Sequence, residues 1–271
     1  MSDQNSNRPT SDRRVIGDDE FKRMMRASTP GVIAQNSYQA VTLAIIAVNV
    51  IVYAVEFVLS GFNQSISTDV LVDMGAMFPP AVQSPADAYR FVVPMFLHMD
   101  VMHLLFNVAA IYSVGALLEQ VLGKGSFVLL YLVAGVTGNV ASYLAALLTG
   151  DVLVVSAGAS TSAFGLFLAV ALLGVFCRDD RAFLREYGKG MWAVIGVNVA
   201  YSLLVPGISI SGHLGGAVGG IIALLMLPSR ATRIPVAVRI IVAVLWLAAV
   251  AAVVLQGEAL GSLLGLSAAL R

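Results

Sequence analysis

The sequence predicts an all-α protein that crosses a membrane several times, and two observations lead to this prediction. First, 58% of the 271 residues are hydrophobic and only 12% are charged, whereas a soluble domain carries about 25% charged residues. Second, the charges gather at the two ends and in a few short loops, so long apolar stretches separate them. Such a chain lacks the charge to cover a water-facing surface, and we expect membrane lipid to surround it.

Seven apolar stretches are long enough to cross a bilayer, since a spanning helix needs roughly 20 apolar residues. We predict spanning helices over residues 40–59, 95–118, 126–148, 157–176, 190–206, 208–227 and 238–256. The fifth and sixth are the weakest, because only a turn around Pro206 and Gly207 separates them. Residues 60–90 are expected to form the one long loop, which three prolines punctuate.

Composition also limits what the rest of the chain can be. Residues 1–36 are polar and charged, so we expect a disordered cytoplasmic tail with no cleavable signal peptide. A formal net charge of zero argues against a nucleic-acid partner. The single cysteine, Cys177, excludes an internal disulfide.

The distribution of lysine and arginine predicts the orientation in the membrane. With the N-terminus in the cytoplasm, 14 of the 16 lysines and arginines lie on the cytoplasmic side. Six are in the tail, one follows the second span, four follow the fourth and three follow the sixth. The positive-inside rule therefore predicts a multi-pass protein of the plasma membrane with residues 60–90 and the C-terminus outside.

This orientation brings the few polar side chains of the spans to a similar depth near the outer surface. The second, fourth and sixth spans all run inward, and they begin with His98, His103 and Asn107, with Ser160, and with His213, respectively. The three histidines are the only ones in the chain. Because polar side chains are costly inside a bilayer, we interpret them as candidates for function.

Ser160 and His213 together suggest a hydrolase. A serine hydroxyl becomes a good nucleophile when a neutral histidine takes its proton. Glycine recurs every four residues beside His213, at 212, 216 and 220, and small residues at this spacing let two spanning helices pack closely. Glycines at this spacing are also common in helices where they serve only helix packing and no catalytic site. Here we expect close packing to bring the Ser160 hydroxyl within hydrogen-bond distance of the His213 imidazole.

His103 and Asn107 are candidates for an oxyanion hole. They lie four residues apart, so they share one helix face. With the backbone N–H of Ser160, both can donate to a carbonyl oxygen that becomes negative. The alternative is a polar clamp between helices. We expect His98 to order its loop, and Phe164, one turn after Ser160, to support His213 or simply to pack.

Other catalytic arrangements fit less well. All lysines are predicted to be cytoplasmic, which excludes a Ser–Lys dyad, and no carboxylate lies inside the fourth or sixth span. We therefore expect a dyad without a buried third member. Ser162 points about 200° around the helix from Ser160, and Ser202 is interpreted as an ordinary polar residue near a membrane surface. We expect no metal or other cofactor, because His98 and His103 lack metal-ligand spacing.

These residues give the chain a resemblance to the rhomboid intramembrane serine proteases. The matching segments are His98-x4-His103-x3-Asn107 followed by Gly115 and Glu119, then Gly158-Ala159-Ser160, then His213-Leu214-Gly215-Gly216, within residues 40–227. The resemblance implies a rhomboid-like core of six spanning helices in residues 37–227. Residues 228–271 would then hold a cytoplasmic loop, a seventh span and a short external C-terminus, as in the six-plus-one subgroup.

The resemblance also implies how the site works. Ser160 would be the nucleophile, His213 the general base and acid, and His103 with Asn107 the oxyanion hole, with Gly158 among the supporting residues. The substrates would be membrane proteins cut in or next to a transmembrane segment.

One position departs from the family pattern. Family members commonly have glycine directly after the nucleophile, and Thr161 is expected to narrow the space there.

The alternative function is a catalytically silent scaffold that binds transmembrane helices. The presence of Ser160, His213, His103 and Asn107 together argues against it. A second alternative is a transporter with a histidine proton relay. The sequence shows no inverted repeat of the kind that such transporters have.

Overall fold

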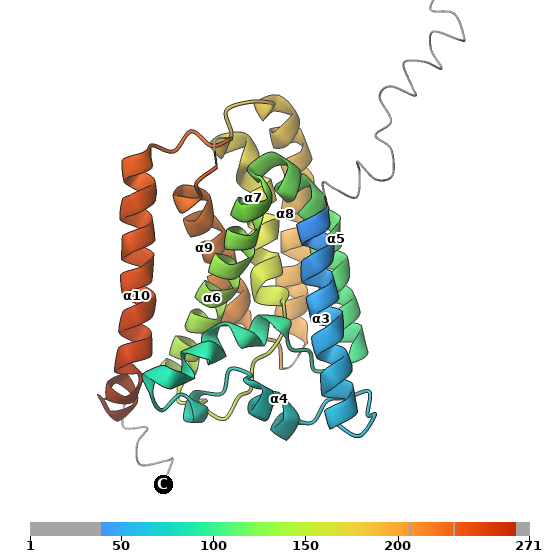
Figure 1. Cartoon of the computed structure of the whole chain (residues 1–271), viewed down its shortest axis with the longest axis vertical. Coiled ribbons are helices and arrows are strands. Elements are labelled where there is room, and N and C mark those ends of the chain that lie inside the picture. The colour runs from blue at the N-terminus through green and yellow to red at the C-terminus, as the bar shows by residue number, and fades with distance from the viewer. Residues whose placement is uncertain (1–38, 206, 230, 264–271) are drawn as a thin grey trace, which may run out of the picture. The chain divides into compact units, whose positions relative to one another are not determined.

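The computed structural model describes residues 39–205, 207–229 and 231–263, and these are helical with no β-strand. The α-helices are α3 (Ala40–Leu59), α4 (Thr68–Met74), α5 (Val101–Leu122), α6 (Lys124–Thr149), α7 (Ser160–Phe176), α8 (Arg181–Leu204), α9 (Ile210–Met226) and α10 (Val236–Leu263) (Figure 1). The predicted tail, residues 1–36, and the end of the chain lie outside the described residues.

The predicted fold class, an all-α polytopic membrane protein, is confirmed. Four of the described helices are long and apolar enough to cross a membrane, namely α3, α5, α6 and α10. The helices α7 and α9 are also apolar but have only 17 residues each. Helix α8 begins at Arg181 among charged residues, so the predicted fifth span corresponds to its second part.

The second predicted span begins later than expected. Residues Val93–Phe96 form the short 3₁₀-helix η3, which contains Pro94, and α5 starts only at Val101. Asp100 caps α5, since its carboxylate accepts the backbone N–H of His103 at 2.8 Å. The expectation that His98 begins this helix is therefore wrong, because His98 lies in the irregular segment between η3 and α5.

Residues 60–90, predicted as one long loop, contain α4 and the 3₁₀-helices η1 (Pro79–Ala81) and η2 (Pro85–Phe91). The Asp87 carboxylate accepts the backbone N–H groups of Gln83 and Ser84 at 3.1 and 2.9 Å. These hydrogen bonds, the one from Gln83 above all, hold the pKa of Asp87 below its ordinary value. This segment is thus folded structure that covers one end of the helices, the lower end in Figure 1.

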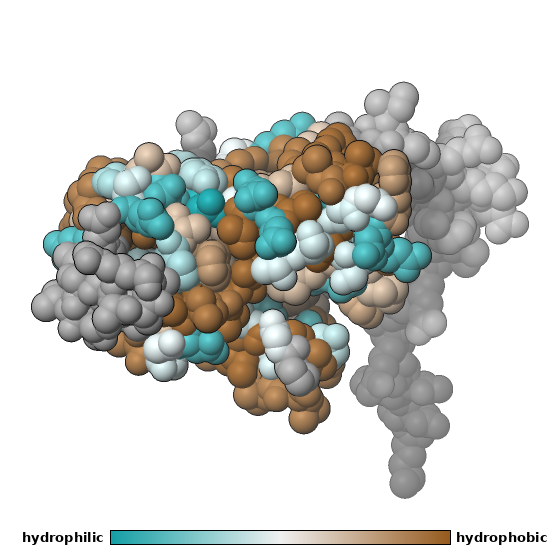
Figure 2. All heavy atoms as spheres, turned by 90° about the horizontal axis from the view of Figure 1, so that it is seen from below, coloured by the Kyte–Doolittle hydropathy of each residue, from teal (hydrophilic) through white to brown (hydrophobic). Residues whose placement is uncertain are grey.

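Helices α5, α7 and α9 all begin at the end that this segment covers (Figure 1). Their alternation with α6 and α8 follows from the short connections between successive helices. Figure 2 looks onto this end and shows polar residues interspersed among hydrophobic ones. The predicted gathering of the three helix starts at one end is therefore present.

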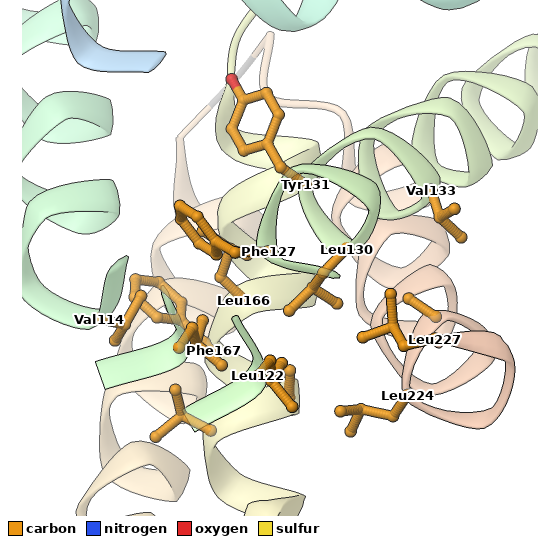
Figure 3. Close-up of a cluster of buried hydrophobic side chains, with 14 of the residues drawn as sticks. Val114, Leu122, Phe127, Leu130, Tyr131, Val133, Leu166, Phe167, Leu224 and Leu227 are labelled. Carbon is orange, nitrogen blue, oxygen red and sulfur yellow. The ribbon is translucent and has the colours of Figure 1, made fainter. Parts of the chain in front are cut away.

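The core lies between α5, α6, α7 and α9 (Figure 3). Its buried side chains include Val114, Leu122, Phe127, Leu130, Tyr131, Val133, Leu166, Phe167, Leu224 and Leu227. In a membrane, lipid tails are as apolar as these side chains, so close van der Waals packing holds the helices together.

Glycines of α9 allow the closest approach in the bundle. A Cβ at Gly216 would overlap with the backbone oxygen of Thr161 on α7. On the adjacent side of the helix, a Cβ at Gly215 would overlap with Ala141 of α6. The predicted glycine face therefore serves two neighbours, with α9 seated against both α6 and α7.

Glu119, near the end of α5, fixes the start of α3. Its carboxylate is buried and accepts the backbone N–H groups of Val41 and Thr42 at 3.1 and 2.9 Å, and the Thr42 hydroxyl at 3.0 Å. The positive end of the α3 dipole favours acceptor oxygens at this position. Gly115 leaves room for Thr42, because a Cβ there would overlap with the threonine side chain.

Helix α10 lies along the outside of α9 and α6. No residue of its most apolar window is buried, as expected for a helix that faces lipid. One polar contact attaches it to α6, where the Trp246 indole N–H donates to the Thr137 hydroxyl at 2.9 Å.

Candidate active site

Ser160 is the first residue of α7, and a glycine places it there. Gly158 has φ +136°, a conformation that side chains disfavour. A Cβ on Gly158 would also lie 2.7 Å from the Cε1 and Nε2 atoms of His103. The backbone N–H of Gly158 donates to the Pro94 carbonyl at 2.8 Å. Gly158 therefore lets the chain turn sharply into α7 while the His103 ring lies directly against it.

The start of α7 differs from the starts of α5 and α9. Asp100 caps α5, and the Ser209 hydroxyl caps α9 by accepting the Gly212 N–H at 3.1 Å. No described side chain caps α7. Because first-turn N–H groups have no partner within their helix, the backbone N–H of Ser160 has neither an intrahelical partner nor a side-chain cap. Such a helix start favours an anionic oxygen.

The predicted contact between Ser160 and His213 is present. The Ser160 Oγ lies 2.9 Å from the His213 Nε2, across the α7–α9 packing described above. Ser160 is half-buried and His213 is 8% exposed. The pair is therefore a hydroxyl and an imidazole held at hydrogen-bonding distance by two closely packed helices.

One further contact fixes the imidazole of His213, and another fixes the start of the helix that carries it. The Phe164 ring stacks on it, with centroids 4.2 Å apart and an angle of 15° between the planes. The start of α9 is tied to α6, since the hydroxyls of Ser209 and Ser142 lie 2.7 Å apart. Of the two alternatives that the sequence left open for Phe164, this stacking favours support of His213 over simple packing.

The second ring nitrogen of His213 has a partner that the sequence analysis missed. The Ser202 Oγ, on α8, lies 2.7 Å from the His213 Nδ1, and Ser202 is 4% exposed. The interpretation of Ser202 as an ordinary polar residue near a membrane surface is therefore wrong. The only available signal was the short α8–α9 turn, which brings residues eleven apart in sequence to the same level.

His103 and Asn107 face the same region from α5. The His103 ring lies against Gly158, next to Ser160. The Asn107 side-chain amide donates to the His103 carbonyl at 3.0 Å. An amide carries two N–H donors, so one remains for another acceptor.

His98 joins α3 to this region. Its backbone N–H donates to both carboxylate oxygens of Glu56 on α3, at 3.1 and 3.2 Å. The His98 ring is fully buried and meets the His103 ring edge-on, with centroids 5.3 Å apart. His98 therefore backs the His103 ring and does not face Ser160 directly.

The two residues that follow Ser160 point elsewhere. The Ser162 hydroxyl is fully buried and donates to the Tyr131 carbonyl on α6 at 2.9 Å. The Thr161 side chain packs against α6 and α9, where Gly138 and Gly212 make room for it. The β-branched residue at position 161 is thus accommodated by glycines of the neighbouring helices.

The arrangement is suited to acyl transfer. It combines a hydroxyl beside a base with several N–H donors near the same point, as such chemistry requires. Within the described part of the chain, no three histidine, cysteine, aspartate or glutamate side chains come together to hold a metal ion.

Comparison with known proteins identifies the family. Residues 85–230 match the model of the rhomboid domain, which is more than half of the chain. The chain is 33% identical over 203 residues to rhomboid protease GluP of Bacillus subtilis, covering 75% of this chain and 38% of that protein. It is 27% identical over 207 residues to Rhomboid-like protease 3 of Toxoplasma gondii, covering 76% of this chain and 74% of that protein.

A third relative is similar over most of its own length. Rhomboid protease GlpG of Haemophilus influenzae is 26% identical over 190 residues, which cover 67% of this chain and 88% of that protein. The matched domain includes the segments that carry Ser160, His213, His103 and Asn107. On these matches, the chain belongs to the rhomboid family.

Proposed function

We propose that this protein is an intramembrane serine endopeptidase. It hydrolyses peptide bonds in or next to the transmembrane segments of membrane proteins, through a dyad of Ser160 and His213. The observation that supports this most is the 2.9 Å contact between the Ser160 Oγ and the His213 Nε2. The relatives named as proteases support the same reaction.

The first half of the reaction forms an acyl-enzyme. The Ser160 Oγ attacks the substrate carbonyl carbon while the His213 Nε2 takes the hydroxyl proton. The carbonyl π electrons move to oxygen, giving a tetrahedral oxyanion. When this collapses, the C–N bond breaks and His213 returns the proton to the departing amine.

Three donors stabilise the oxyanion in this proposal. They are the Nε2–H of His103, the free amide N–H of Asn107 and the backbone N–H of Ser160, which the uncapped start of α7 leaves open. In the second half, His213 takes a proton from water, which attacks the acyl carbon. The acid product leaves and Ser160 regains its hydroxyl.

We place this activity in residues 37–227 and assign the chain to the six-plus-one subgroup, with α10 as the seventh span. The arginine and lysine distribution supports a plasma-membrane protein with a cytoplasmic N-terminus. The active site then opens toward the extracytoplasmic side, and a substrate helix reaches it from the surrounding lipid.

Labelling with a fluorophosphonate tests the proposal, because this probe phosphonylates an activated serine. We expect the full chain in liposomes to be labelled, and the variant Ser160→Ala to lose all labelling. Ser162→Ala is the matched control, since Ser162 is a buried serine bonded to a backbone carbonyl, and it should keep the wild-type rate. Labelling that persists in Ser160→Ala contradicts the assigned nucleophile. Wild-type protein that is folded but unlabelled would instead favour the scaffold.

A further inference from the structure

Ser202 makes two short contacts, and its single proton can serve only one of them. Its Oγ lies 2.7 Å from the Asn198 carbonyl, one turn earlier on α8, and 2.7 Å from the His213 Nδ1. A hydroxyl has one hydrogen to donate but can accept with its lone pairs. The carbonyl oxygen can only accept. Two oxygens at this distance repel each other unless a proton lies between them.

These two contacts determine which nitrogen of His213 carries the proton. If Ser202 donates to the Asn198 carbonyl, its lone pair faces the Nδ1, and that contact needs a proton on the Nδ1. A neutral imidazole carries one N–H, so the Nε2 is then bare. A bare Nε2 is what a base needs to accept the proton of Ser160, 2.9 Å away. The reverse arrangement would leave two oxygens in contact without a proton and would put the N–H toward Ser160.

We propose that Ser202 is a positioning residue that holds His213 in the tautomer with a protonated Nδ1 and a bare Nε2. The inference rests on the proposed function, and it replaces the expected dyad without a third member. A serine hydroxyl on α8, backed by the Asn198 carbonyl, takes the place that a buried aspartate has in soluble serine proteases.

The surroundings of the imidazole leave Ser202 as its partner on this side. Ser202 is 4% exposed and His213 is 8% exposed, so bulk water does not replace the contact. The stacked ring of Phe164 covers one face of the imidazole. The ring is therefore held between Ser160, Ser202 and Phe164, which fixes its rotation as well as its tautomer.

The same contact also matters during the reaction. When the Nε2 takes the Ser160 proton, the ring becomes an imidazolium with both nitrogens protonated. The Nδ1–H keeps its bond to the Ser202 Oγ, whose lone pair faces the new positive charge. No proton moves beyond the Nδ1, and Ser202 keeps its own proton toward Asn198.

Threonine and valine at position 202 separate the hydroxyl from the shape of the side chain. In the full chain in liposomes, we expect Ser202→Thr to retain the rate constant of fluorophosphonate labelling within about threefold. Ser202→Val should lower it about tenfold, the factor expected for one lost hydrogen bond. Tyr201→Phe is the control, because it removes a hydroxyl from the adjacent, 52% exposed position, and it should match the wild type. Equal rates for Ser202→Thr and Ser202→Val, whether fast or slow, overturn the proposal.

A second measurement can overturn the proposal without a variant at position 202. The chain has only three histidines, so the ring nitrogens can be resolved by nitrogen-15 NMR of the full chain labelled at histidine. The signals lost in His213→Asn identify His213. We expect a protonated Nδ1 and a bare Nε2 in the wild type, and a mixture of tautomers in Ser202→Val. A wild type with a protonated Nε2 overturns the proposal. Absence of any labelling in the wild type would instead contradict the proposed function, so the two failures are distinguishable.

Discussion

The side-chain amide of Asn107 has one donor in use and one free, and this difference separates two interpretations of the residue. The bond to the His103 carbonyl lies within α5, so it does not join two helices. An interhelical clamp would be expected to bond across to α7 or α9. The free N–H suits a role in the reaction better.

We therefore predict that Asn107→Ala lowers the rate of fluorophosphonate labelling by about a hundredfold, as the loss of one oxyanion donor does. The midpoint of thermal unfolding should change little. Ser113→Ala on the same helix is the control, because Ser113 is exposed and bonds only to the Ala110 carbonyl. A large drop in unfolding temperature with unchanged labelling would identify Asn107 as a clamp.

At the scale of single residues, the sequence predicted the contacts that follow from the spacing of its glycines and polar residues. Ser160 meets His213 because glycines at 212 and 216 permit the approach, and both sets of residues can be seen in the sequence. Ser202 could not be assigned in this way. The sequence shows the short turn between α8 and α9. It does not show how α8 is rotated about its axis, and the contact of Ser202 depends on both.

The close contact between α7 and α9 can be tested with one methyl group. In Gly216→Ala the new Cβ overlaps with the Thr161 backbone, which cannot move without shifting the start of α7. We expect the two helices to separate, the unfolding temperature to fall, and labelling to drop by at least about a hundredfold, since a misplacement of 1 Å has that effect.

Gly196→Ala on α8 is the matched control for that experiment. A Cβ at Gly196 meets nothing within 4 Å, and alanine favours a helix over glycine by about 1 kcal/mol. This variant should be as stable as the wild type or slightly more stable, with unchanged labelling. Equal behaviour of the two variants would mean that the glycine contact does not determine the position of Ser160.

At the scale of elements, the apolar runs predicted where helices occur but not where each begins. The second span was expected to begin at residue 95, but α5 begins at Val101, directly after the Asp100 cap. Helix α8 starts well before its apolar run, because Arg181 and Arg185 can extend from a helix into water. Residues 60–90 lack a long apolar run, so hydropathy alone could not reveal α4 and the 3₁₀-helices.

The proposed orientation in the membrane rests on the charge distribution and can be tested with single cysteines. Cys177 is the only native cysteine, so Cys177→Ser gives a clean background. We predict that Asp69→Cys reacts with a membrane-impermeant maleimide in intact cells, whereas Lys124→Cys reacts only after the cells are opened. Both positions are exposed in the structure. The opposite pattern would reverse the proposed topology and place the site toward the cytoplasm.

The lengths of the central helices bear on how the molecule sits in lipid. At 1.5 Å per residue, the 17 residues of α7 and α9 span about 25 Å. The hydrocarbon core of a bilayer is about 30 Å thick. Either the bilayer thins around these helices or their ends lie below its surface.

The contact of Trp246 on α10 with Thr137 on α6 lets the fluorescence of the protein itself report on this helix. The chain has two tryptophans, Trp246 on α10 and Trp192 on α8. Indole emission responds to the loss of a hydrogen-bond partner, so Trp246 reports whether its helix stays docked on Thr137. In Trp192→Phe the remaining fluorophore follows that helix alone, and in Trp246→Phe the signal comes from α8. Departure of the last helix can thus be timed separately from movement of the helix that carries Ser202, without attaching a dye.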